Sequence, residues 1–139
     1  MNRYNISLDT NVFIFGLRNR DQYAVLILKN LFRFDISISE QVERELRRNL
    51  TESEFRRFYD VLATLTTFQI SYQPLHEDFL RFYQQWGLKT GDARIAAFCE
   101  QEQIDLFVSE NRHFLHELPE RSFEIINCRT CCERFGLRP

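Results

Sequence analysis

The chain has 139 residues, the usual size of one domain, and this length is sufficient to bury a hydrophobic core. Hydrophobic residues make up 44% of the sequence and the net charge is −2, so the composition excludes a disordered chain and a strongly basic or acidic one. No apolar run approaches the roughly 20 residues of a membrane-spanning helix, and the N-terminal residues lack the pattern of a signal peptide. We therefore expect residues 1–139 to form a single cytoplasmic domain.

Strand and helix patterns alternate along the sequence. In chain order, the first half predicts a strand at 4–8, a helix at 21–32, a strand at 34–39 and a helix from Glu40, with Ser39 as its N-cap. The second half predicts a helix that begins with a capping box at 51–54 and runs to 65, a strand at 67–72, helices at 75–87 and 92–103, and strands at 105–110 and 123–128. This alternation predicts an α/β fold of three layers, with a parallel sheet of about five strands flanked by helices on both faces.

Acidic residues follow several of the predicted strands. Asp9 ends the first strand in the segment ISLDTNVFI, where it is also placed to cap the helix that follows. Glu45 lies in the helix after the second strand, beside Leu46 at the border of the apolar face. Asp92 lies near the start of the helix KTGDARIAAF, where acids are favoured by the helix dipole. Each acid therefore has a structural interpretation as well as a functional one.

A further polar cluster of Ser109, Glu110 and Asn111 ends the predicted strand DLFV. The carboxyl ends of parallel strands meet at one edge of a sheet, where α/β proteins bind their ligands. Four segments are therefore expected to bring carboxylates or amides to the same place. Hard oxygen ligands without histidine or thiolate suit Mg²⁺ or Mn²⁺, and such ions act on phosphate esters. The pattern indicates the chemistry of a metal-dependent nuclease.

Four motifs in this order, SLDTNVFI, SEQVEREL, GDARIAAF and FVSENRHF, resemble those of the PIN domain, and in particular the small ribonucleases of the VapC toxin type. The resemblance covers residues 4–135. It implies a PIN-like fold and a metal-dependent endoribonuclease that hydrolyses RNA phosphodiester bonds, with Mg²⁺ or Mn²⁺ as cofactor. The first, second and third acids of the family map to Asp9, Glu45 and Asp92.

The sequence departs from the family at the fourth position. The family carries an aspartate in a T-x-D-x-x-F pattern, whereas SENRHF places Ser109 at the threonine and Asn111 at the aspartate. We expect Asn111 to line the pocket as a catalytic and metal-binding residue through its carbonyl oxygen, with Thr10, Asn11 and Ser109 as supporting residues. Glu110 supports the site only if its side chain turns inward, against the alternation of a strand.

The missing charge at Asn111 leaves a second interpretation open, namely a PIN-like module that has lost catalysis and binds RNA or a protein partner. The three retained acids favour the active nuclease. Other folds with an aspartate at a strand end fit less well. Asn11 occupies the place of the second aspartate of a haloacid-dehalogenase-type phosphatase, and no glycine-rich phosphate loop ending in lysine is present.

Of the 18 basic residues only Lys29 and Lys89 are lysines, and arginine is the preferred residue for contacts with phosphates and base edges. We expect RNA contacts around the acidic pocket from Arg44, Arg48, Lys89 and Arg112. The family resemblance also implies a homodimer that is held inactive by a small antitoxin protein. The aromatic helices FRRFYDVL and FLRFYQQW are candidate surfaces for such a partner, with ordinary core packing as the alternative for each aromatic residue.

The cysteines give only a weak indication of a metal or redox site. Cys128 and Cys131 have C-x-x-C spacing and Cys132 follows directly. A structural zinc site needs a second pair of ligands, and only Cys99 and three scattered histidines are available for it. We expect reduced thiols without a functional role.

Overall fold

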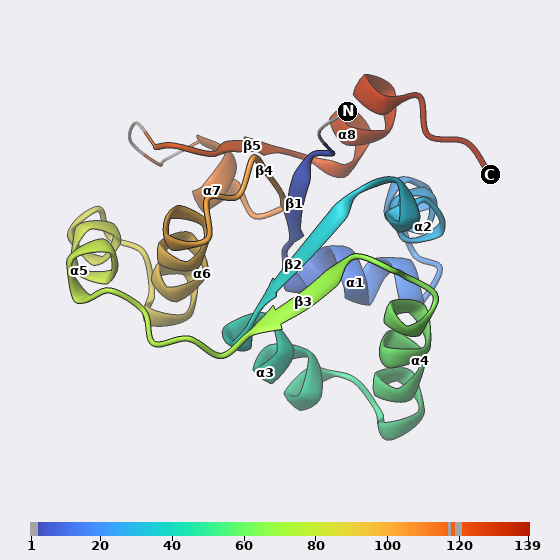
Figure 1. Cartoon of the computed structure of the whole chain (residues 1–139), viewed down its shortest axis with the longest axis horizontal. Helices are drawn as coiled ribbons and strands as arrows, with labels where there is room; N and C mark the ends of the chain where they lie inside the picture. The colour runs from blue at the N-terminus through green and yellow to red at the C-terminus, as the bar shows by residue number, and fades with distance from the viewer. Residues whose placement is uncertain (1–2, 117, 119–120) are drawn as a thin grey trace.

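The fold is built around a parallel sheet of five strands in the order β3-β2-β1-β4-β5 (Figure 1). A computed structural model describes residues 3–116, 118 and 121–139. The strands are β1 (Asn5–Leu8), β2 (Asp35–Ser39), β3 (Phe68–Ser71), β4 (Leu106–Val108) and β5 (Glu124–Ile126). All pairings between neighbouring strands are parallel, which confirms the predicted sheet.

Helices cover both faces of this sheet. They are α1 (Thr10–Leu17), α2 (Gln22–Lys29), α3 (Glu40–Asn49), α4 (Glu52–Ala63), α5 (Glu77–Gln85), α6 (Thr90–Gln101), α7 (Arg112–His116) and α8 (Cys128–Phe135), with a 3-10 turn η1 (Leu31–Arg33) after α2. α1, α2 and α4 lie on one side of the sheet and α5 and α6 on the other (Figure 1). α8 packs against α2. The arrangement confirms the predicted three-layer α/β fold.

The predicted elements are present, but several of their ends differ. The helix predicted at 21–32 ends at Lys29, because Asn30 leaves the helical conformation with φ −115° and η1 follows. The strand predicted at 123–128 ends at Ile126, because the Asn127 side chain accepts a hydrogen bond of 2.8 Å from Thr130 N–H and so begins α8. The sequence patterns did not predict α7 or α8.

The buried apolar residues lie on both sides of the central strand β1. Ile6 and Leu8 are fully buried within the sheet. On one face, Phe13 of α1 meets Phe58 of α4 edge to face, with 5.1 Å between the ring centroids. α6 contributes buried small residues such as Ala96, which allow this helix to lie close to the strands. This packing holds the carboxyl ends of the strands in fixed positions.

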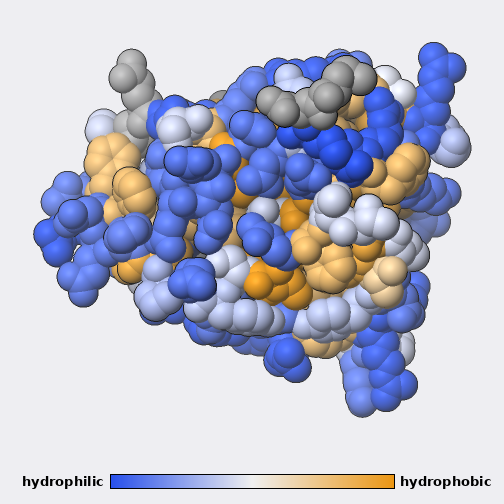
Figure 2. Space-filling model, in the orientation of Figure 1, coloured by the Kyte–Doolittle hydropathy of each residue, from blue (hydrophilic) through white to orange (hydrophobic). Residues whose placement is uncertain are grey.

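Some apolar side chains reach the surface, for example over α5 at the left of the view in Figure 2. The aromatic residues of α4 and α5 are divided between core and surface. Phe58 and Tyr83 are fully buried, whereas Phe82 is 40% and Trp86 is 55% exposed. Core packing therefore explains Phe58 and Tyr83, but it does not explain the exposed residues Phe82 and Trp86. In the described part of the chain, no helix is long and apolar enough to cross a membrane.

The predicted capping box at the start of α4 gives a direct test of the fold. The Thr51 hydroxyl accepts a hydrogen bond from Glu54 N–H, and the Glu54 carboxylate accepts one from Thr51 N–H. Because Thr51→Ala removes one of these bonds, we expect the free energy of unfolding in urea to fall by about 1 kcal/mol. The exposed neighbour Ser53 is a matched control, and Ser53→Ala should change this free energy by less than about 0.5 kcal/mol. Equal effects of both variants would contradict the capping assignment.

Candidate active site

Two neighbouring strands, β1 and β4, end side by side at the point where the strand order reverses. From β1 the chain adds β2 and β3 on one side of the sheet, and then β4 and β5 on the other side. β1 and β4 are adjacent, with Leu8 opposite Val108, although β2 and β3 separate them in sequence. Open α/β sheets bind ligands at the carboxyl ends of their strands at such a point. Asp9 follows β1 and Ser109 follows β4, and the Ser109 hydroxyl donates a hydrogen bond of 2.6 Å to Asp9 Oδ2. These two residues mark the centre of the candidate site.

Asp9 caps a helix and also lies in this site. Its Oδ1 accepts a hydrogen bond of 2.8 Å from Thr10 N–H at the start of α1, and the residue is only 5% exposed. Burial is the main reason that the pKa of Asp9 is raised from 3.8 to about 6, and the charges of Asp92 and Glu45 act in the same direction. The hydrogen bonds from Ser109 and Thr10 lower this pKa in part. The capping and functional interpretations of Asp9 are therefore compatible.

Glu45 reaches the site from α3. Val42 and Leu46 of the same helix are buried, so Glu45 lies at the border of the apolar face. Its Oε1 accepts a hydrogen bond of 2.7 Å from the Thr10 hydroxyl. Its Oε2 accepts one of 2.8 Å from the amide nitrogen of Gln41, one helical turn earlier. Both carboxylate oxygens are thus held by neutral donors.

Asp92 lies in the first turn of α6, which approaches α3 closely. A Cβ on Gly91 would lie 3.1 Å from both Gln41 Nε2 and Glu45 Oε2, so the absence of a side chain permits this approach. Burial raises the pKa of Asp92. The hydrogen bond from Asn111 lowers this pKa, and the charge of Glu45 raises it. Asp9, Glu45 and Asp92 therefore influence one another across a small space.

Asn111 lies beside Asp92 with its amide nitrogen toward the carboxylate. Nδ2 donates to Asp92 Oδ2 at 3.4 Å, whereas Oδ1 accepts a hydrogen bond of 3.0 Å from His113 N–H at the start of α7. The N–H group of Asn111 donates to the Ser109 hydroxyl oxygen. The carbonyl oxygen that we expected to face a cation is thus engaged by the backbone, and the side chain supplies a donor to Asp92 instead.

No ion pair with a described residue neutralises the three carboxylates. Their hydrogen-bond partners are neutral groups, contributed by Thr10, Gln41, Ser109 and Asn111. Lys89 and His113 act on Asp92 only by electrostatic attraction, which lowers the pKa of that acid. Within residues 3–116, 118 and 121–139, no three His, Cys, Asp or Glu side chains already form a metal-binding group. The cluster is therefore negatively charged and complementary to a cation.

Two predicted supporting residues are not joined to this cluster. The carboxylate of Glu110 accepts a hydrogen bond of 2.8 Å from Cys128 N–H at the start of α8. It points away from Asp9 because consecutive residues of an extended segment face opposite sides. Asn11 is half-buried in the first turn of α1 and makes no hydrogen bond with another described side chain. Thr10 and Ser109, by contrast, contact the acids directly.

The four basic residues expected to contact RNA are all exposed. Lys89 precedes α6 and Arg112 begins α7. Arg44 and Arg48 lie on α3, and Arg44 donates a hydrogen bond of 2.9 Å to Glu40. The charge of Lys89 reaches Asp92, as its effect on that pKa shows. Of these four residues, only Lys89 has a described effect on one of the three acids.

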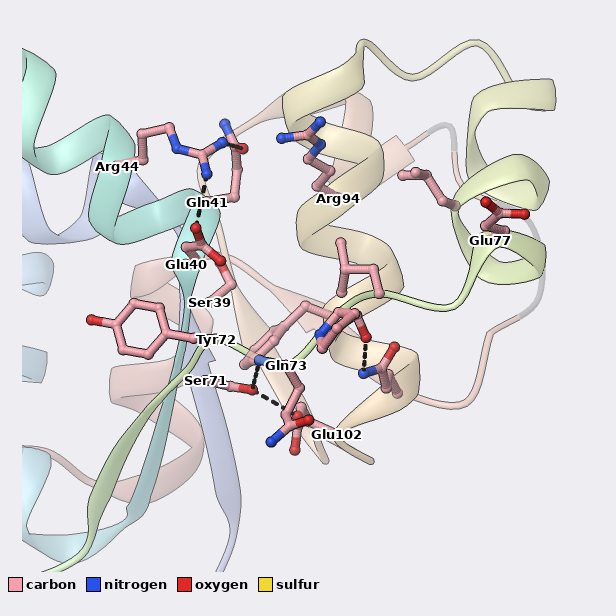
Figure 3. Close-up of a pocket in the computed structure, with 15 residues that line it drawn as sticks. Ser39, Glu40, Gln41, Arg44, Ser71, Tyr72, Gln73, Glu77, Arg94 and Glu102 are labelled. Carbon is pink, nitrogen blue, oxygen red and sulfur yellow. Dashed lines mark hydrogen bonds and ion pairs between the residues drawn. The ribbon is translucent and has the colours of Figure 1, made fainter.

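Sequence reasoning missed Gln41 as a residue of this site. Its signal was the spacing to Glu45, because residues four apart in a helix lie on the same face. Gln41 also lines a pocket of about 360 Å³ between α3, the loop after β3 and helices α5 and α6 (Figure 3). His113 was missed as well, because its influence on Asp92 depends on how α7 packs and not on any motif.

The cysteines lie away from this chemistry. All four thiols are free and buried. Burial raises the pKa of Cys131 to about 12 and that of Cys132 to about 11, so both thiols stay protonated at neutral pH. The C-x-x-C spacing is therefore part of the buried face of α8, where Cys128, Cys131 and Cys132 pack against the core.

The raised pKa of Asp9 predicts an unusual dependence of stability on pH. Between about pH 4 and pH 6 the folded protein retains a proton that the unfolded chain has released, so stability falls as the pH rises through this window. Asn carries no charge, and its Oδ1 can still accept from Thr10 N–H while its Nδ2 donates to the Ser109 hydroxyl oxygen, which reverses the second bond. We expect Asp9→Asn to be more stable than the wild type by about 2–3 kcal/mol at pH 7 in EDTA, and equally stable near pH 4.

Urea unfolding of both proteins across this pH range measures the difference. Asp60 is an exposed acid on α4, and Asp60→Asn is the matched control that should follow the wild type at every pH. A stability difference that does not change with pH would show that the charge of Asp9 is not the cause.

Comparison with known proteins gives a family and a fold. Residues 6–118 match the PIN domain, and no curated protein matches the chain. Among solved structures, the chain is similar to VapBC2 from Rickettsia felis, which was crystallised with a DNA fragment from its promoter. The sequence identity is 15% and the TM-score is 0.61, and the alignment covers 88% of this chain and 98% of that chain. PAE2754 from Pyrobaculum aerophilum is 16% identical with a TM-score of 0.62, over 96% of both chains.

A third solved structure is that of the PIN domain endonuclease Utp24. It is 18% identical with a TM-score of 0.51, over 90% of this chain and 85% of that one. At these identities the likeness shows the fold. The match at 6–118 spans most of the sequence and includes β1, β4 and the three acids that gather at their ends. The chain belongs to the PIN domain family.

Proposed function

We propose that this protein is a metal-dependent endoribonuclease in which Asp9, Glu45 and Asp92 together bind Mg²⁺ or Mn²⁺. The observation that carries the proposal is that Asp9, Glu45 and Asp92 act on one another's charges beside the carboxyl ends of β1 and β4, with neutral donors as their only described hydrogen-bond partners. The raised pKa values of Asp9 and Asp92 reflect burial and mutual repulsion of charges. A divalent cation would relieve both effects.

The chemistry of the donors suits these ions. Asp9, Glu45 and Asp92 offer carboxylate oxygens, without thiolate ligands, and hard cations such as Mg²⁺ prefer oxygen. When bound, the ion would supply Lewis-acid activation of water and stabilisation of charge on the phosphate.

The chain's own residues would hold the acids in place for this chemistry. The Thr10 hydroxyl fixes Glu45. The Ser109 hydroxyl fixes Asp9. The Asn111 amide holds the third acid as a donor, so in this proposal Asn111 is a positioning residue that replaces a negative charge by a hydrogen bond. Such fixed groups limit the rearrangement that catalysis requires.

Membership of the PIN domain family and the fold shared with the endonuclease Utp24 support the nuclease. RNA as the substrate is supported by the exposed basic residues Arg48, Lys89 and Arg112. These side chains would bind phosphates of the RNA strand, and the carboxylates would hold the ion.

We also infer a cytoplasmic toxin with protein partners. The support is the fold shared with VapBC2, together with the exposed aromatic residues Phe82 on α5 and Trp86 at its end, which are typical of contact surfaces. The inferred partners are a second copy of this chain and a small antitoxin protein. The molar mass of the purified protein in light scattering, alone and after co-expression with the product of an adjacent gene, would test both.

The nuclease is tested by incubating a mixed RNA pool with purified protein in Mg²⁺, in Mn²⁺ and in EDTA. We expect cleavage only with a divalent ion. Asp9→Asn should reduce the rate at least about a hundredfold, because the stabilisation that a bound ion provides is worth several kcal/mol. Titration calorimetry with Mn²⁺ gives a readout that is independent of cleavage, and the same variant should bind the ion more weakly.

Asp60→Asn is again the matched control, because it removes one exposed carboxylate without touching the cluster. It should cut RNA at the wild-type rate. If folded wild-type protein without a co-purified inhibitor cuts no RNA and binds no Mn²⁺, the nuclease is refuted, and the catalytically inactive RNA-binding or protein-interaction module becomes the better interpretation.

A further inference from the structure

A second concave site adjoins the carboxylate cluster. The pocket beside Gln41 has a volume of about 360 Å³, within the usual range for small-ligand sites. Leu75, Leu80 and Phe98 form an apolar part of its lining, and the remainder is mostly polar and comes from the ends of β2 and β3, the loop after β3, and helices α3, α5 and α6. Flat apolar surface with polar groups at the edge is the combination that a nucleobase requires.

Gln41 connects this pocket to the carboxylate cluster. Gln41 lines the pocket and at the same time donates a hydrogen bond of 2.8 Å to Glu45. The close approach of α6 at Gly91 brings the two sites together from the other side. A nucleotide chain bound at Glu45 would therefore lie next to a residue of the pocket wall.

The far wall of the pocket is held by hydrogen bonds between described residues. Gln101 of α6 accepts from His76 N–H at 2.9 Å and donates to Pro74 O at 2.9 Å, which fixes the loop after β3. Ser71 donates to Glu102 at 3.0 Å. A wall that is already formed loses little entropy when a ligand binds.

Arg94 has no partner among the described residues. The residue is half-buried, its guanidinium makes no hydrogen bond or ion pair with them, and it points into the space between α3 and α6 (Figure 3). Glu102 lies toward the other end of the pocket, and its second oxygen has no described partner (Figure 3). The pocket thus offers hydrogen-bond donors at one end and an acceptor at the other.

This polarity selects among the possible ligands. A phosphate in the pocket would meet the carboxylates of Glu40, Glu77 and Glu102, so the lining disfavours an anion. Guanine carries two acceptors, O6 and N7, on one edge, and its N1–H and N2–H₂ donors on the adjoining edge. Arginine binds the first edge with two parallel hydrogen bonds, and a carboxylate accepts from the second.

We propose that this pocket binds a guanine base of the RNA strand, next to the phosphodiester that the carboxylate cluster acts on, with Arg94 as the residue that reads the base. The inference rests on the proposed nuclease function for the identity of the strand. It gives the enzyme a preference for cleavage at a fixed distance from guanine, and it assigns Glu102 to the opposite edge of the same base.

The first test uses nucleosides, which carry no phosphate and therefore do not depend on the metal site. Guanosine added to ¹⁵N-labelled wild-type protein should shift the amide signals of Gln73, Arg94 and Glu102. 7-Deazaguanosine, which lacks the N7 acceptor, and cytidine should bind at least about tenfold more weakly, as expected for the loss of a bidentate contact. Equal binding of all nucleosides, or no shift with any of them, would overturn the proposal.

Variants identify the residue responsible. Arg94→Ala should weaken guanosine binding at least about tenfold, and Arg94→Lys, which keeps the charge but not the planar fork, should also weaken it. Arg56 is an exposed arginine of α4 in an ion pair with Glu52, and Arg56→Ala is the matched control that should bind as the wild type does. Unchanged binding by folded Arg94→Lys and Arg94→Ala would refute the role of Arg94.

Sequencing of the RNA ends separates this inference from the nuclease itself. The wild type and Arg56→Ala should cut at a constant distance from guanine, and Arg94→Ala should lose that preference. Metal-dependent cleavage without a guanine preference would refute the pocket and leave the nuclease intact. Absence of cleavage, with guanosine binding that depends on Arg94, would refute the nuclease and leave the base-binding pocket.

Discussion

The burial of the Asp9 carboxylate is the constraint on which the rest of the site depends. A charge at the end of the central strand, only 5% exposed, requires hydrogen-bond donors close by. One comes from the backbone at the start of α1 and the other from Ser109 at the end of β4. The same pair of bonds therefore sets the start of a helix, joins two strand ends and aims the carboxylate at the edge of the sheet.

Two carboxylates away from the site, Glu54 and Glu124, form ion pairs with arginine residues. Glu54 is bound by Arg18 at 2.9 Å, and this hydrogen bond is the main reason that its pKa is lowered to about 2. The pKa of Glu124 is lowered by Arg134 in the same way. Guanidinium groups thus stabilise the charges of Glu54 and Glu124, whereas Asp9, Glu45 and Asp92 at the sheet edge make no such described ion pair and repel one another. Buried like charges without ion-pair partners, which shift the pKa values of the groups concerned, are typical of functional sites.

Much of the fold could be predicted because periodicity and parallel topology determine it. Apolar alternation located the five strands, and the rule that strand ends meet at one edge placed Asp9 next to Ser109, whose hydroxyl donates to it. What could not be predicted depends on distances between elements. Gly91 indicated a free backbone in the sequence, whereas in the structure it permits contact between two helices. The orientation of Asn111 and the polarity of the pocket depend on hydrogen bonds that no spacing reveals.

The uncharged side chain of Gln41 lies between the carboxylate of Glu45 and the guanidinium of Arg44 and hydrogen-bonds to both. Its amide nitrogen faces the carboxylate of Glu45, and its oxygen faces the guanidinium of Arg44 at 3.4 Å. Consecutive helix residues point in different directions, so Glu45 and Arg44 do not meet directly. The amide acts as a dipole aligned between anion and cation, and it satisfies both without joining them. Gln41 therefore prevents an ion pair between Glu45 and Arg44, so the carboxylate of Glu45 keeps its negative charge unneutralised although a guanidinium lies nearby.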